Sequence, residues 1–163
     1  MTRLVLFLSL MVTILPAGAF ALPQDAFHGR WSGTSGENAQ VSLRLDAEGD
    51  GFAVSLDHPF LDLEKVSFVP SDRNGVFEED KGGGLFSMFM GSDTQTLHGA
   101  PILWARFAGP SLVFYRLEIA KSGHMTLDRF RLDPDGGSTR MLAERIENGM
   151  TVSRDELVLE RAP

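Results

Sequence analysis

The last third of the chain decides the fold, because five strand-like segments alternate there with short turns. The segments are ILWARF (102–107), LVFYRLEI (112–119), MTLDRFRL (125–132), TRMLAERI (139–146) and TVSRDELVLE (151–160). The breaks between them are rich in glycine, proline, asparagine and aspartate, which suit tight turns. Connections this short join only antiparallel neighbours, since parallel strands need a crossover of about a dozen residues or more. The sequence therefore predicts an up-and-down antiparallel meander.

Segment 125–132 is less regular than the others, because both of its faces carry apolar and charged residues. This pattern indicates either a β-bulge or a strand whose two faces both meet mixed surroundings.

The alternation extends toward the N-terminus. Val41–Leu45 and Phe52–Leu56 repeat an apolar residue at every second position on either side of an acidic, glycine-containing turn, which predicts a β-hairpin. A third strand is expected over Leu63–Val69, and Asn74-Gly75 marks another tight turn. Residues 57–65 and 86–90 could form short helical turns, but no longer helix is expected.

The expected fold class is all-β, with about eight to ten strands in series. Such a series must close on itself or form a sandwich, because long exposed edges invite aggregation. A closed or partly open barrel is favoured over a sandwich, since hairpin-length connections dominate.

The first 21 residues have the three parts of a secretory signal peptide. Arg3 supplies a positive start, Leu4–Leu15 an apolar run ended by Pro16, and Ala19-Phe20-Ala21 a small-residue exit. The alternative, a transmembrane anchor, needs about 20 apolar residues, which the run lacks. We therefore expect residues 1–21 to be cleaved, residues 22–163 to form a single domain without a membrane span, and the protein to be exported, either periplasmic or secreted.

Composition excludes several classes of function. The chain has no cysteine, so thiol catalysis, zinc–thiolate sites and disulfides are ruled out. Arg3 is the one charged residue of the signal, so the mature chain keeps 14 basic against 22 acidic side chains, a net charge of −8. This balance argues against nucleic acids and anionic membrane surfaces as partners, because both require basic patches.

The start of the mature chain carries a short motif, Gly29-Arg30-Trp31. A Gly-x-Trp on the first strand resembles the start of lipocalins and other calycin-type barrels. The resemblance implies that Trp31 closes one end of a barrel beneath an arginine from a late strand, either Arg154 or Arg161. It also implies a cavity for a small apolar ligand.

The segment Leu85–Met90 (LFSMFM) is unusually apolar on both faces and follows three glycines. Phenylalanine and methionine together form an adaptable, polarizable surface. Phe86, Met88, Phe89 and Met90 are therefore candidate ligand-binding residues, as a lid or wall of a pocket, or as a patch for a protein partner. The alternative is an interior strand that is buried on both sides.

Two arginines lie beside aromatic residues on neighbouring strand candidates, in Trp104-Ala105-Arg106 and Tyr115-Arg116. Inside a barrel, such an arginine could anchor the carboxylate of an amphiphile such as a fatty acid, which makes these four side chains candidate ligand-binding residues with Trp31. The alternative is an outward arginine that covers an aromatic ring. Glu118, on the same face as Arg116, favours the outward orientation through cross-strand pairing.

No catalytic motif is present. The chain lacks a nucleophile elbow, a zinc-protease motif, a phosphate loop and a dinucleotide fingerprint, and its four histidines lie far apart in the sequence. We predict no cofactor and no metal. Three hypotheses remain, in this order: an exported barrel that binds a small, largely apolar or amphiphilic ligand, an envelope module that contacts a protein partner through residues 85–90, and a periplasmic hydrolase.

Overall fold

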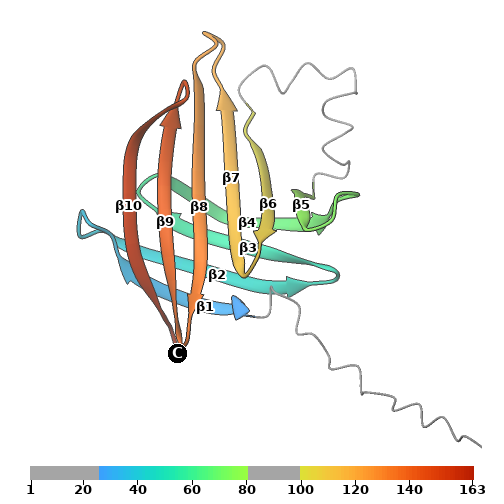
Figure 1. Ribbon diagram of the computed structural model, residues 1–163, viewed down its shortest axis with the longest axis vertical. Helices are drawn as coiled ribbons and strands as arrows, with labels where there is room; N and C mark the ends of the chain where they lie inside the picture. The colour runs from blue at the N-terminus through green and yellow to red at the C-terminus, as the bar shows by residue number, and fades with distance from the viewer. Residues whose placement is uncertain (1–25, 81–99) are drawn as a thin grey trace, which may run out of the picture.

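The computed structural model describes residues 26–80 and 100–163. These residues form a closed barrel of ten antiparallel strands, in which each strand pairs with its neighbours in the chain and β1 also pairs with β10 (Figure 1). The strands are β1 (Gly29–Thr34), β2 (Gln40–Glu48), β3 (Gly51–His58), β4 (Leu61–Pro70), β5 (Val76–Glu79), β6 (Ile102–Ala108), β7 (Ser111–Ile119), β8 (Met125–Asp135), β9 (Ser138–Glu147) and β10 (Met150–Arg161). The expected signal peptide and the segment Leu85–Met90 lie outside the described residues.

The predicted all-β meander and its closure into a barrel are confirmed. Each segment quoted from residues 102–160 forms one strand, and the tight turn at Asn148-Gly149 uses positive φ angles of 47° and 87°. Residues 57–65 form the β3–β4 hairpin, so the expectation of helical turns there was wrong. The short strand β5 is an addition to the predicted set.

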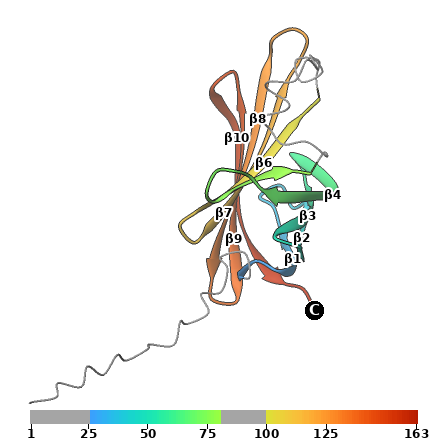
Figure 2. The same cartoon turned by 90° about the vertical axis from the view of Figure 1, so that its right-hand side faces the viewer.

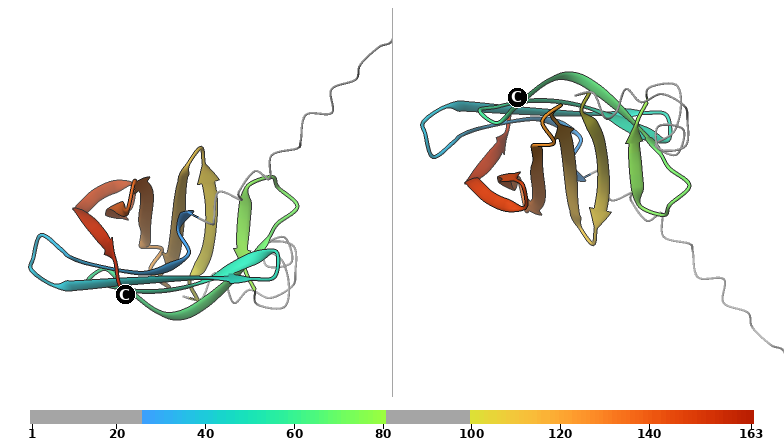
Figure 3. Two further views of the ribbon diagram at one scale, coloured as in Figure 1. Left: turned by 90° about the horizontal axis from the view of Figure 1, so that it is seen from below. Right: turned by 90° about the horizontal axis from the view of Figure 1, so that it is seen from above.

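The barrel is flattened into two layers that cross each other. Strands β1–β4 run across strands β6–β10, as Figures 1 and 3 show. The hairpins β7–β8 and β9–β10 project beyond the β1–β4 layer, which is clear from two directions (Figures 1 and 2). Among the described strands, β1–β4 therefore cover one end of the inner face of β7–β10 less than the other.

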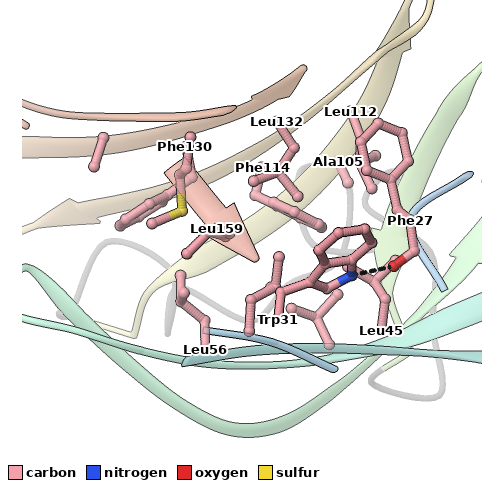
Figure 4. Close-up of a cluster of buried hydrophobic side chains, with 14 of the residues drawn as sticks. Phe27, Trp31, Leu45, Leu56, Ala105, Leu112, Phe114, Phe130, Leu132 and Leu159 are labelled. Atoms are coloured by element: carbon pink, nitrogen blue, oxygen red, sulfur yellow. Dashed lines mark hydrogen bonds between the residues drawn. The ribbon is translucent and has the colours of Figure 1, made fainter. Parts of the chain in front are cut away.

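Apolar side chains fill the covered part of the interior, where 20 buried residues form one cluster (Figure 4). Aromatic rings contribute much of its volume, and Phe52 lies 5.0 Å from Phe77 and 5.4 Å from Phe68, centroid to centroid. At the edge of this cluster Trp31 is 4% exposed and donates its indole N–H to the carbonyl oxygen of Phe27 at 2.8 Å.

The inner face changes from apolar to charged along single strands. On β8, Leu132 and Phe130 belong to the apolar cluster, whereas Asp128 and Thr126 continue the same face toward the projecting hairpins. The strands β7 and β9 make the same change. The mixed pattern of segment 125–132 thus reflects a strand with mixed surroundings, and no register shift interrupts the pairing of β8 with either neighbour.

Candidate functional site

A buried ion cluster occupies the charged part of the inner face. Asp128 on β8 has no solvent exposure, and it lies directly opposite Arg116 on β7 and Arg145 on β9. Arg145 donates two hydrogen bonds to its carboxylate, at 2.7 and 3.1 Å, and Arg116 donates one at 3.3 Å. The strand register therefore creates a cation–anion–cation row that keeps the buried carboxylate paired.

The cluster carries more acids than bases. Arg116 also donates to Glu118 at 2.6 Å. Glu147 follows Arg145 on the inner face of β9 and lies opposite Thr126. The pKa of Arg145 is raised by its hydrogen bonds to Asp128, and the charges of Asp128, Glu147 and Glu118 act in the same direction. Glu118 and Glu147 each expose 39% of their side chains, so they are the members of the cluster that solvent reaches most.

His58, at the end of β3, borders the cluster from the opposite layer. Its side chain is fully buried, and its ring packs edge-on against Phe60 at 4.7 Å and Phe130 at 5.3 Å. The Phe60 backbone N–H donates to His58 Nδ1 at 3.1 Å, so the neutral ring carries its proton on Nε2, which lies 3.5 Å from Asp155 Oδ2. Burial lowers the pKa of His58, and the charges of Asp155, Asp128 and Asp57 oppose this shift.

A small hollow opens to solvent beside His58 and Arg145. Its volume is about 190 Å³, and it lies between the β1–β2 turn, the β3–β4 turn and the start of β10. Its walls include Glu37, Phe60, Arg154 and Asp155. Two of these residues connect the hollow with the interior. Phe60 lies under the Arg145 guanidinium, whose Nη2 donates to the Phe60 carbonyl at 2.6 Å, and Asp155 faces His58.

Trp31 lies where an arginine from the last strand covers it. The Arg161 Cζ atom is 5.1 Å from the centroid of the Trp31 ring, and Arg161 also donates to the His28 carbonyl at 2.6 Å. Of the two arginines expected for this position, Arg161 is therefore the one in contact with Trp31. Trp31 belongs to the apolar cluster and has no contact with the ion cluster around Asp128.

The aromatic and arginine candidates on β6 and β7 are divided between the two faces of the sheet. Trp104 and Tyr115 lie opposite each other on the outer face and stack at 4.8 Å, and Arg106 lies over Tyr115 at 5.7 Å. The outward alternative thus describes Arg106. Arg116 points inward, so the outward orientation that we expected for Arg116 and Glu118 was wrong. Phe86, Met88, Phe89 and Met90 lie outside the described residues.

Sequence reasoning missed most of the residues in the cluster. Asp128, Arg145, Asp155 and His58 come from four different strands, and only the register between strands brings them together. One local signal was available. A charged residue at an inward position of a strand, such as Asp128 between Thr126 and Phe130, is unusual unless a partner neutralises it.

His58 and Asp155 resemble two members of a nucleophile-activating set, but their geometry does not favour a hydrolase. His58 Nδ1 accepts from Phe60, and Nε2 faces Asp155, so neither nitrogen is free to take a proton from a nucleophile. Across residues 26–80 and 100–163, no three His, Asp or Glu side chains are grouped as a metal site would require. The same residues contain no helix with the length and apolar character of a membrane span.

No protein-family model, curated protein or solved structure matches the chain at a significant level.

Proposed function

We propose that this protein is an exported β-barrel that binds a small amphiphile with a cationic head group at the charged end of its interior. The charge balance of the ion cluster supports this proposal most directly. Two guanidinium groups, Arg116 and Arg145, are outnumbered by the carboxylates of Asp128, Glu118, Glu147 and Asp155.

The head group follows from which charges are already paired. Both arginines donate to Asp128, and Arg116 donates to Glu118 as well. A ligand carboxylate would have to displace these contacts and leave Asp128 buried without a partner, which is costly. A cation instead meets the partly exposed Glu118 and Glu147, whose partners in the free protein are Arg116 at 2.6 Å and His124 at 3.6 Å, and it displaces no contact of Asp128. A fatty acid is therefore a poorer ligand than an alkyl amine or a quaternary ammonium compound.

The size of the ligand follows from the packing. Aromatic side chains fill the apolar half of the interior, and the hollow beside the cluster holds about 190 Å³. Typical pockets for drug-sized ligands measure about 300–1,000 Å³. Phe60 and Asp155 line this hollow, whereas Glu118 and Glu147 do not, so we infer a small ligand whose short apolar part lies against Phe60. The face of this ring also suits a cation.

Native mass spectrometry of the mature protein, purified without detergent, tests the proposal. A carried amine is expected as an extra mass that is lost on denaturation. The Glu118→Gln/Glu147→Gln double variant should lose it, while the outer-face control Glu156→Gln/Glu160→Gln keeps it. A clean apo mass after incubation with short alkyl amines, or equal retention by both double variants, would overturn the proposal.

A second candidate function, an envelope module that contacts a protein partner, is supported by the outer face of β6–β9. Ile102, Leu117, Leu127 and Ile146 lie opposite one another on consecutive strands and form an apolar row across the sheet. Trp104 and Tyr115 form the neighbouring row. Ile102 is 8% exposed, and Leu117, Leu127 and Ile146 are partly exposed. Outward positions of a barrel are usually polar, and partly exposed apolar residues grouped there are typical of interaction sites.

The Leu117→Arg variant separates this candidate from the first. If the row contacts a partner, the native protein elutes from gel filtration of a cell extract in a larger complex, and the variant elutes as a monomer. If both elute as monomers, the row does not act as an interface.

A further inference from the structure

Like charges lie directly opposite each other at two places on the outer face of β1–β4. Arg30 on β1 pairs in register with Arg44 on β2, and Asp57 on β3 pairs with Asp62 on β4. All four residues are exposed. Like charges at directly opposed positions of an antiparallel pair destabilise a sheet, whereas opposite charges there stabilise it. Exchanging one arginine with one aspartate would have produced attracting pairs, so this arrangement sacrifices stability.

The two repelling pairs border one groove. It has a volume of about 500 Å³ and lies across the outer faces of β1–β4, beside Ala162 near the C-terminus. The arginines line its β1–β2 side, and Asp57, Asp62 and Glu64 line its β3–β4 side. Hydroxyl groups of Ser32, Ser42 and Ser55 lie between or beside the charges. The groove therefore has basic side chains on one side and acidic side chains on the other, and the apolar side chains of Leu43, Leu56 and Leu63 also line it.

Most of these charges are unpaired. Among residues 26–80 and 100–163, Arg44 has an ion-pair partner in Asp46 at 2.7 Å, while Arg30, Asp57, Asp62 and Glu64 have none. The protein thus holds a cationic and an anionic surface next to each other without joining them. Binding sites use such destabilising arrangements, because charges left unpaired in the free protein can pair with a ligand.

We propose that this groove is a second binding site, which takes a linear ligand with an anionic group at one end and a cationic group at the other. The anionic group pairs with Arg30 and Arg44, and the cationic group pairs with Asp57 and Asp62. The two pairs lie two strands apart and are offset by two residues along the strands, because Arg44 pairs with Ser55 and Asp57 pairs with Ser42. At a strand spacing of 4.7–4.9 Å and a rise of about 3.4 Å per residue, this corresponds to roughly 12 Å. The chain between the two ends lies beside the serine hydroxyls and against the apolar part of the groove lining.

Two substitutions test the proposal with variants that should fold at least as well as the native chain. Arg30→Glu and Asp62→Arg each replace a repelling pair with an attracting one, so each should raise the midpoint of urea unfolding while binding weakens. A substitution that harmed the fold would lower the midpoint instead. The control is Arg140→Gln, at an exposed position of β9 outside the groove.

The probes are linear ω-amino carboxylic acids of increasing chain length, titrated into the full mature chain by calorimetry. Affinity should be highest for the chain length that spans the two pairs. Alkyl amines and alkyl carboxylates of the same length should bind at least about tenfold more weakly, a difference of about 1.4 kcal/mol in binding free energy. Each groove variant should weaken the best probe by a similar factor, and the control should not.

Equal affinity for all chain lengths, or binding that survives both groove variants, would overturn the proposal. Failure of this proposal can be distinguished from failure of the proposed amphiphile site. The groove variants leave Glu118 and Glu147 intact, so they should keep any extra mass that native mass spectrometry detects.

Discussion

Asp128 and Arg145 face each other across β8 and β9, and the guanidinium of Arg145 donates two hydrogen bonds to a carboxylate that has no solvent exposure. Arg145 also reaches the opposite layer through the carbonyl of Phe60. One side chain therefore joins the buried charge to the turn that lines the hollow. The candidate site depends on this connection.

Replacing Asp128 should weaken the fold, because two inward arginines would lose their common partner. For Asp128→Asn we expect a loss of about 2–4 kcal/mol in the free energy of unfolding. This loss is at or below the usual cost of breaking a buried ion pair, because both arginines can still reach water. Asp135→Asn is the control, as its carboxylate is 70% exposed and lies 3.8 Å from Arg140. Urea unfolding of both variants checks the difference, and similar losses would contradict it.

The two tryptophans should differ in their importance for stability. Trp31→Phe leaves the buried Phe27 carbonyl without its donor, so it should cost about 1–3 kcal/mol. Trp104→Phe keeps an aromatic ring against Tyr115 on the outer face and should cost less than about 1 kcal/mol. Thermal unfolding followed by circular dichroism measures both. An equal or larger effect of Trp104→Phe would show that Trp31 does not anchor the core.

Gly51, the first residue of β3, lies against the neighbouring strand. An added Cβ atom there would lie 1.9 Å from the carbonyl oxygen of Phe68, so the backbones of β3 and β4 would have to separate. We expect Gly51→Ala to cost about 1–3 kcal/mol or more. Gly137→Ala, in the β8–β9 turn, is the control because nothing lies within 4 Å of its added Cβ. Denaturation of both variants tests this, and a neutral Gly51→Ala would contradict the close approach.

His58 should make stability depend on pH. Its pKa in the folded protein lies below the ordinary value of 6.5 because the ring is buried, whereas the unfolded chain titrates near that value. Between the two pKa values the unfolded state therefore binds more protons than the folded state. The contribution of His58 to stability is fully present above pH 6.5 and is lost as the pH falls below this value. One proton changes the free energy of unfolding by at most about 1.4 kcal/mol per pH unit.

The His58→Phe variant removes this titration and keeps an aromatic ring between Phe60 and Phe130. It also leaves the Phe60 N–H without an acceptor, which lowers stability equally at every pH. The free energy of unfolding, measured between about pH 5 and pH 8, should therefore depend less steeply on pH in the variant. Identical slopes would contradict a buried neutral His58.

The meander was predictable because its determinants are local. Each turn after residue 100 has glycine or proline where a tight turn needs it, and each segment between turns is long enough to form a strand. Strand β5 was missed because Val76–Glu79 has only four residues, too few for alternation to show. The turn at Asn74-Gly75 was its one signal.

The candidate site was much less predictable, because its contacts cross between strands. Spacing shows that Arg116 and Glu118 share a face, but it does not show whether that face points inward. Their inward position depends on Asp128, which neutralises Arg116 from the next strand. Likewise, nothing local connects His58 with Asp155, nearly a hundred residues away, which β10 brings to 3.5 Å.

Backbone amide NMR titration of the mature protein with a short alkyltrimethylammonium salt, compared with the fatty acid of the same chain length, tests the central claim most directly. We predict that the cation shifts amide resonances of residues 116–118, 126–128 and 145–147 and of the turn at Phe60, while the fatty acid leaves them unchanged. No shifts with either probe, or equal shifts with both, would contradict a cation-binding site at the charged end of the barrel.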